Sequence, residues 1–312
     1  MRGKILILIF FVISTAFLAP CIGDVVYSPI ILSSLFNPKD IDSWIILNLR
    51  IPRVLMGLIV GVSLSVSGVA MQNVFRNPLA EPYILGVSTG AGLGVLVGFI
   101  LGISFYLMPV LAFTSATLTV LTVYNLAKIR GAITTESLLL AGIAMNFFLY
   151  ALEWLILVKT NAHMILGWLV GYLGNVEWDD VRIVSLSLIP AVTIYVFANH
   201  MNALLLGEEN AFYLGVDVKK VLKILIALST LATSITVAFV GIIGFVGLMI
   251  PHIARSIFGE DNRFLIPSSA LIGATFLAWT DALARILDIP VGIITMLCGG
   301  PFFLYIMKRY KR

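Results

Sequence analysis

The sequence predicts an all-α polytopic membrane protein with about ten transmembrane helices, and three observations support this fold class. Of its 312 residues, 60% are hydrophobic and only 12% are charged, and the mean hydropathy is +1.06. A soluble domain carries roughly 25% charged residues. A soluble fold of this length has too little polar surface to keep so much apolar side chain out of water. We therefore expect one transmembrane domain over residues 1–312, embedded in the lipid bilayer.

The expected spans are apolar segments close to the roughly 20 residues that a helix needs to cross the hydrocarbon core. They run about 4–22, 51–72, 83–102, 107–127, 135–158, 179–198, 221–242, 245–258, 265–286 and 290–308. The first has a basic start like a signal peptide, but its length and Pro20 favour an uncleaved span. The eighth is short and contains Pro251. The tenth is interrupted by Gly299, Gly300 and Pro301, which neighbouring groups must compensate.

Glycine recurs at every fourth position of the third span. These glycines are Gly86, Gly90, Gly94, Gly98 and Gly102. In lipid, where helices have no hydrophobic drive to associate, a stripe of small residues lets two helix backbones approach closely. We interpret the stripe as a packing surface without a ligand, and the same spacing recurs in the second span.

The distribution of basic residues predicts the orientation. Ten spans place both termini on one side of the membrane. Of the 20 Lys and Arg residues, six fall on the opposite side, which leaves fourteen on the side of the termini. The six are Lys39, Arg50, Arg53, Lys159, Arg182 and Arg285. Because basic residues accumulate on the cytoplasmic side, we expect a multi-pass protein of the cell (inner or plasma) membrane with both termini in the cytoplasm.

A polar island interrupts the apolar pattern between the sixth and seventh spans, at about residues 200–220. It reads LLLGEENAFYLGVDVKKVL and carries Glu208, Glu209, Asp217, Lys219 and Lys220. Inserting each charge into the bilayer costs about 2.5–3.5 kcal/mol, so the five together cost on the order of 15 kcal/mol. The island is therefore expected in the cytoplasm, facing water or another protein.

Two segments on the outer side, about 23–48 and 159–178, are longer than turns. The second, KTNAHMILGWLVGYLGNVEW, is too polar and rich in glycine to span, yet it contains Trp168 and Trp178. Tryptophan is enriched at membrane interfaces. We expect a short helix there that either lies on the outer surface or dips back into the membrane.

The chain lacks the sequence patterns of the common catalytic and metal sites. It contains no G-x-x-x-x-G-K-[ST] phosphate-binding loop and no H-E-x-x-H zinc motif, and its three histidines are scattered. Its two cysteines, Cys21 and Cys298, lie far apart and are expected to pack as small apolar residues. We therefore expect no catalytic residue, no metal and no cofactor in this chain, and no ATPase site of its own.

Two acidic residues lie inside expected spans, Glu153 and Asp281. Acids at such depth are candidates for proton relays in secondary transporters. Arg285 follows Asp281 by four residues, so we favour an ion pair on one helix face for Asp281. Glu153 shares a polar stripe with Asn146, and it either lines a water-filled pathway or extends outward to the membrane surface.

Arg50 and Arg53, in the run LRIPR, stand at the outer end of the second span. Arginines on the outer side run against the charge bias and need an explanation. They either anchor the helix to lipid phosphates or form a docking point for an acidic partner.

Three runs resemble a known family. They are LRIPRVLMGLIVGVSLSVSGVAMQNVFRNPLAEPYILGVSTGAG, GIIGFVGLMIPHIAR and DIPVGIITMLCGGPFFLYI. They are similar to the permeases of the ABC importers for iron-siderophore, haem and vitamin B12. The likeness covers about residues 45–308, and the PLAEP-x-x-LGVSTGAG and GFVGL-x-x-PH blocks are specific. His252 belongs to the second block, and we expect it to be packed and hydrogen-bonded rather than reactive.

The resemblance implies a type II ABC importer permease fold and a set of partners. These are a second copy of the chain, with the pathway at the dimer axis, two cytoplasmic ABC ATPase subunits that bind ATP and Mg²⁺, and an extracytoplasmic substrate-binding protein. It implies a metal chelate as substrate and no nucleic acid. We favour ferric siderophore as cargo because that branch is the largest, with cobalamin, haem and molybdate left open.

The resemblance also implies roles for individual residues. The loop that couples the permease to the ATPase matches Gly207, Glu208, Ala211 and Gly215. Positions that dock the binding protein match Arg50, Arg53 and Arg285. Two competing hypotheses remain, an ion-coupled secondary transporter that uses Glu153 and Asp281, and a membrane scaffold without a transported substrate.

Overall fold

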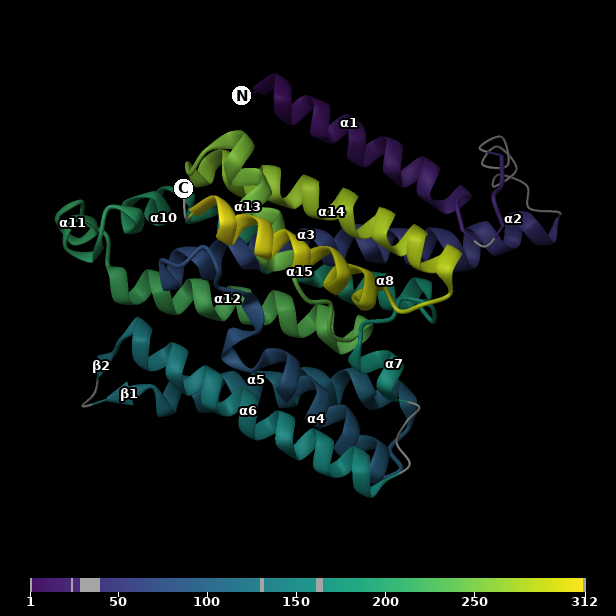
Figure 1. The fold of residues 1–312 in the computed structure, drawn as a ribbon, viewed down its shortest axis with the longest axis horizontal. Coiled ribbons are helices and arrows are strands. Elements are labelled where there is room, and N and C mark those ends of the chain that lie inside the picture. The colour runs from purple at the N-terminus through teal and green to yellow at the C-terminus, as the bar shows by residue number, and fades with distance from the viewer. Residues whose placement is uncertain (1, 24, 29–39, 130–131, 161–164, 311–312) are drawn as a thin grey trace.

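The computed structural model describes residues 2–23, 25–28, 40–129, 132–160 and 165–310, and these are almost entirely helical (Figure 1). The helices are α1 (Arg2–Leu18), α2 (Ile41–Ile45), α3 (Ile51–Phe75), α4 (Val87–Ile100), α5 (Met108–Leu126), α6 (Thr135–Lys159), α7 (Leu166–Leu169), α8 (Trp178–Val184), α9 (Leu188–Val196), α10 (Ala198–Leu205), α11 (Glu208–Tyr213), α12 (Val218–Val240), α13 (Val246–Phe258), α14 (Asn262–Leu287) and α15 (Val291–Tyr310). Two short strands, β1 (Lys128–Ile129) and β2 (Ala132–Ile133), pair antiparallel between α5 and α6.

The helices fall where the ten spans are predicted. Within the described residues, six helical segments are long and apolar enough to cross a membrane, and α8–α10 form a seventh that bends by 54°. Three shorter apolar helices, 87–100, 246–258 and 291–304, occupy the positions of the remaining three spans. The second span differs from the prediction, because the helix runs without a break from Ile41 to Phe75. The bend after α9 is also unpredicted.

The long helix α3 lies at the centre of one group of helices. It packs against α12, α13 and α14, while α4, α5 and α6 form a second group that joins the first through α12 (Figure 1). Nearly every residue of α3 from Val60 to Phe75 is buried. By contrast, α1 leaves Leu6, Phe10 and Phe17 exposed. Such apolar surface suits contact with lipid chains.

Close helix contacts depend on glycines. A Cβ added to Gly90, Gly94 or Gly98 of α4 would collide with α5, so the packing surface expected on the third span is present at these positions. Gly86 has a φ of +85° and begins α4 in a left-handed conformation. The packing expectation is wrong for Gly102, whose φ is +66° and where an added Cβ would meet nothing within 4 Å, because this residue forms the turn that follows the helix.

The elements at the two ends of the bundle differ in character. Figure 1 shows α10, α11, the β1–β2 hairpin and both chain termini towards one end, and α2 and α7 towards the other. The two termini therefore share an end with the polar island, as an even number of spans requires. We call these the α11 end and the α7 end.

The second outer segment dips back into the bundle. After α7, the backbone N–H of Tyr172 donates to the carbonyl of Val240 (2.9 Å), and the N–H of Gly292 donates to that of Gly171 (3.3 Å). Leu173 is fully buried. The segment is thus inserted between the end of α12 and the start of α15. Residues 24, 29–39 and 161–164 of the two outer segments lie outside the described part of the chain.

Candidate functional sites

The polar island folds into a short helix flanked by two glycines. Gly207, with a φ of +103°, precedes α11, and Gly215, with a φ of +82°, follows it. Residues with side chains rarely adopt such left-handed angles. The two glycines therefore let the chain enter and leave a helix of six residues, which explains why glycine stands on each side of it.

The buried and exposed faces of α11 have different chemistry. Ala211 is fully buried, whereas Phe212, Tyr213 and Leu214 are 70%, 76% and 63% exposed. Glu208 forms an ion pair with Arg76 at the end of α3, with a distance of 2.9 Å between the charged atoms. Three consecutive exposed apolar side chains in a polar loop mark a surface for a protein partner. These three residues were not predicted as part of the site, although their apolar character within the polar island distinguishes them.

The predicted ion pair of Asp281 is part of a larger cluster at the α7 end. Asp281 is fully buried, and the Nε of Arg53 donates to its two carboxylate oxygens at 2.9 and 3.0 Å. The Nε of Arg285 lies 3.4 Å from the same carboxylate, as the spacing of four residues predicts. Arg53 comes from α3, 228 residues away in the sequence, so spacing alone did not reveal it.

Arg50 and Arg285 hold the end of the first span. Arg50 is 5% exposed, and its guanidinium donates to the carbonyl of Val25 (2.8 Å) and lies over the ring of Tyr27. Arg285 donates to the carbonyl of Ala19 (2.9 Å). The three arginines predicted to dock a binding protein thus make internal contacts, which gives them a structural role. Docking itself stays a prediction.

A cavity of about 530 Å³ opens between α6, the start of α4 and the loops around residues 80 and 243. Asn146 of α6 lies at its wall. The Asn146 side chain accepts a hydrogen bond from Thr89 (2.8 Å) and donates to the carbonyls of Tyr83 (3.3 Å) and Ile84 (3.2 Å). These hydrogen bonds satisfy the Asn146 amide at the polar part of the wall. Phe147 and other apolar side chains form the rest of the wall. Asn146 therefore lies at the wall of a cavity, and its role in a transport pathway stays a prediction.

An acidic residue that the sequence analysis did not select also lines this cavity. Glu81 lies in the loop between α3 and α4, outside the spans. Burial raises the pKa of Glu81 to about 7, against a hydrogen bond from the backbone of Phe245 that lowers it. Glu81 was not predicted as a candidate because it lies outside the expected spans.

Glu153 occupies a different position from the one predicted. It is 4% exposed and is not among the residues that line the cavity. Its carboxyl group packs against Gly92 of α4, beside Leu169 of α7, and its Oε1 has no hydrogen-bond partner within the described residues. The side chain therefore does not extend to the membrane surface, and a role in a transport pathway stays a prediction.

His252 packs as expected. Its ring lies 5.8 Å from that of Phe302 in an edge-on arrangement between α13 and α15. Within the described part of the chain, no group of three or more His, Cys, Asp or Glu side chains is arranged to hold a metal ion.

Comparison with known proteins points to one family. The FecCD transport family matches residues 6–309. BtuC of Halobacterium salinarum, a cobalamin import system permease protein, is 39% identical over 280 residues, covering 88% of this chain and 76% of that protein. HmuU of Yersinia pestis, a hemin transport system permease protein, is 37% identical over 295 residues, covering 89% of this chain and 88% of that protein. YfmD of Bacillus subtilis, an Fe(3+)-citrate import system permease protein, is 40% identical over 275 residues, covering 86% and 82%.

A solved structure agrees over the whole chain. It is an inward-facing conformation of a metal-chelate type ABC transporter, with a TM-score of 0.88, 28% identity, and coverage of 99% of this chain and 100% of that chain. The predicted all-helical permease fold is therefore confirmed. The chain belongs to the FecCD transport family and is the membrane-spanning permease subunit of an ABC importer.

Proposed function

We propose that two copies of this chain import a metal chelate, with two ATPase subunits bound at the α11 ends and a substrate-binding protein at the α7 ends. The observation that carries this assignment is α11, a helix between two left-handed glycines with Phe212, Tyr213 and Leu214 exposed. A surface of this kind suits insertion into a cleft of a partner protein. ATP and Mg²⁺ are bound by the ATPase subunits, and the α11 end faces the cytoplasm, as the basic residues favour.

The free energy of ATP binding is transmitted to the membrane helices through contacts between α11 and the ATPase that differ between two ATPase states. ATP binding draws the two ATPase subunits together, and α11 moves because it contacts their open and closed states differently. The displacement changes the access to a path at the dimer axis. The cavity beside Asn146 and Glu81 is one half of this path, and its partly polar and partly aromatic walls suit an organic chelate.

The cargo is a metal chelate of the class named for the relatives. These relatives carry cobalamin, hemin and ferric citrate by name. We favour a ferric siderophore, and molybdate also stays open. Competition for uptake among these compounds, measured with the assembled importer in liposomes, decides between them.

The test of coupling uses a matched pair of glycines. Gly215 and Gly102 both have positive φ angles, +82° and +66°, and a Cβ added at either position would meet no atom within 4 Å. Valine at either position strains the backbone, while its Cβ meets no neighbouring atom within 4 Å. We expect Gly215→Val to reduce uptake by at least about tenfold while ATP hydrolysis continues, since α11 no longer moves with the ATPase. Gly102→Val, in a turn remote from α11, serves as the control. Normal uptake by Gly215→Val would refute the coupling role.

A further inference from the structure

The end of α3 contacts three other elements through three polar side chains. Gln72 accepts a hydrogen bond from Arg255 of α13 (2.9 Å) and donates to the carbonyl of Leu248 (3.3 Å). Asn73 exchanges two hydrogen bonds, each of 3.2 Å, with Asn262 at the start of α14. The third, Arg76, pairs with Glu208 of α11. One turn of α3 is therefore linked to α13, α14 and α11.

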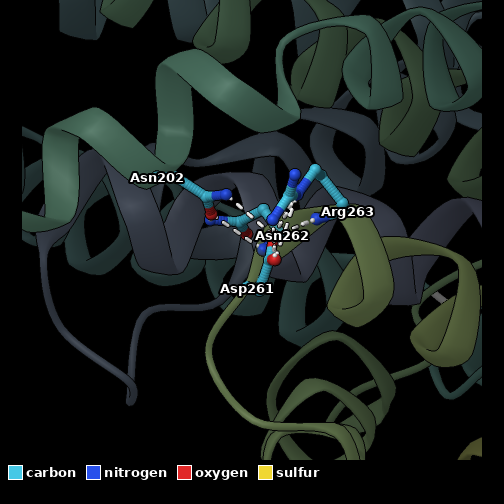
Figure 2. A network of polar contacts seen from close by, with 4 residues as sticks. All are labelled: Asn202, Asp261, Asn262 and Arg263. Carbon is cyan, nitrogen blue, oxygen red and sulfur yellow. Dashed lines mark hydrogen bonds and ion pairs between the residues drawn. The ribbon is translucent and has the colours of Figure 1, made fainter. Parts of the chain in front are cut away.

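Residues 198–213, which form α10 and α11 and are called the arm, join the same network through Asn202 of α10. The Asn202 side chain donates to Asp261 (2.8 Å), and its oxygen accepts from both the backbone N–H (2.8 Å) and the side chain (2.9 Å) of Asn262. Figure 2 shows Asn202 reaching from α10 towards Asp261 and Asn262. Every hydrogen-bonding group of this amide except one N–H has a partner among these residues.

Burial makes the network resistant to partial opening. Gln72, Asn73 and Asn262 are 3%, 2% and 0% exposed. A buried amide that loses its partner gains no water in exchange, so separating α10 from α14 and α3 is unfavourable. Apolar side chains would hold the helices together too, but they would let them slide, whereas paired amides fix one relative position.

The charged member of the network keeps its charge over the physiological range. Hydrogen bonds from Arg263, followed by that from Asn202, hold the pKa of Asp261 well below its usual value. Arg263 donates from three of its nitrogen atoms, including its backbone N–H. Asp261 therefore accepts from Asn202 throughout that range, and the link does not switch with pH.

We propose that Gln72, Asn73, Asn202, Asp261 and Asn262 form an amide junction whose residues are positioning residues for transport. The junction makes α10, the end of α3 and the start of α14 move as one body when the ATPase displaces α11. The proposal rests on the coupling role of α11 and adds which helices its motion is transmitted to. Apart from Ala211, α11 is not buried, so the arm needs such an attachment to move the long helices.

The first test measures ATP consumed per chelate imported by the assembled importer in liposomes. Asn202→Leu and Asn73→Leu preserve side-chain size and remove the hydrogen bonds. We expect the ratio to rise at least about fivefold, the lower end of ordinary coupling between sites. The matched control is Asn125→Leu, an exposed amide at the end of α5. An unchanged ratio in both variants overturns the proposal, and a merely structural role would lower the amount of complex without changing the ratio.

A second test follows the motion directly. Spin labels are placed at Phe212 on α11 or at Ile286 near the far end of α14, both exposed, in a Cys298→Ser background, and distances between the two copies are measured with and without ATP. With the native junction, we expect both distances to change when ATP binds. With Asn202→Leu, we expect the distance at Phe212 to change and that at Ile286 to stay constant. If the distance at Phe212 is constant even in the native junction, the proposed function fails rather than the junction.

A pair exchange keeps the proposal testable if a leucine variant fails to assemble. Asn202→Asp places two carboxylates together and should uncouple transport. Adding Asp261→Asn restores a donor opposite an acceptor and should return the ATP-to-chelate ratio to within about twofold of the native value. A double variant that remains as uncoupled as Asn202→Asp overturns the proposal.

Discussion

Asparagine in place of Asp281 tests what the buried ion cluster does. Asp281 is the acceptor for Arg53, whose side chain is 15% exposed, and lies beside Arg285, whose side chain is 6% exposed. The substitution hardly changes size but removes the negative charge between two guanidinium groups. Asp281→Asn therefore leaves the guanidinium groups of Arg53 and Arg285 close together without the negative charge that neutralises them.

The expected loss follows from the burial of the partners. Removing one member of a buried ion pair costs about 3–5 kcal/mol of unfolding free energy. Arg285 retains the carbonyl of Ala19 and Arg53 retains some contact with solvent, so we expect the lower end, about 3 kcal/mol. Since 1.4 kcal/mol is a factor of ten, the ratio of folded to unfolded protein falls roughly a hundredfold.

The assay is reversible unfolding in mixed micelles, with a double-mutant cycle. Arg53→Met in the Asp281→Asn background relieves one of the two unpaired charges, so the combined loss should be smaller than the sum of the single losses by about 1 kcal/mol or more. Asp179→Asn is the control, because its exposed pair with Arg182 should contribute about 0–1 kcal/mol. Unchanged stability of Asp281→Asn together with lost uptake would refute this reasoning and favour an ion-coupled role for the carboxylate.

Three further outcomes are expected. Gly61→Ala drives a methyl group into the α14 backbone and should cost about 1–3 kcal/mol of unfolding free energy, whereas the added Cβ of Gly300→Ala meets nothing within 4 Å. Equal losses of unfolding free energy in a titration would contradict the close contact. The pKa of Glu81 is raised to about 7 in the folded state, so folding takes up a proton below that pH, and the melting temperature should rise as pH falls from 8 towards 5. Glu81→Gln should remove this rise. An identical pH profile in the variant would contradict the prediction. Phe212→Ala should weaken ATPase binding at least about tenfold in a pull-down titration, while Phe105→Ala, exposed near the start of α5, should not; equal binding would exclude α11 from the interface.

The spans were predictable because insertion into lipid demands a long apolar run. The prediction 135–158 matches α6, and 245–258 matches α13, within a residue at each end. The continuation of α3 back to Ile41 was missed because this stretch contains Asp42 and Arg50, which lower its hydropathy, although a helix needs no apolar side chain where it leaves the membrane. The bend of 54° after α9 falls where the apolar run ends and Asn199, His200 and Asn202 begin. Hydropathy marks the end of the span there, but it does not indicate that the chain continues as a helix in another direction.

Local geometry was predictable at the sites, and distant pairing was not. Gly207 and Gly215 indicated a short helix between them, because glycine permits the left-handed turns at each end. The spacing of Asp281 and Arg285 indicated their pairing. Nothing in one sequence indicates that Asn73 meets Asn262, 189 residues later, or that Arg53 reaches Asp281, because these pairs depend on how the helices pack.

The placement of the acidic residues bears on the choice between ATP-driven and ion-coupled transport. A proton relay needs carboxyl groups that water can reach and that change partner as the protein moves. Asp281 is held between two arginines, and Glu153 is enclosed by α4 and α7, so neither meets that condition in this conformation. Glu81 does face a cavity, but it lies in a loop outside the spans. On α11, by contrast, Glu208, Phe212 and Tyr213 are open to a partner, and this helix follows α10 of the amide junction. This arrangement favours an energy source applied at the α11 end over one that acts through acids within the membrane.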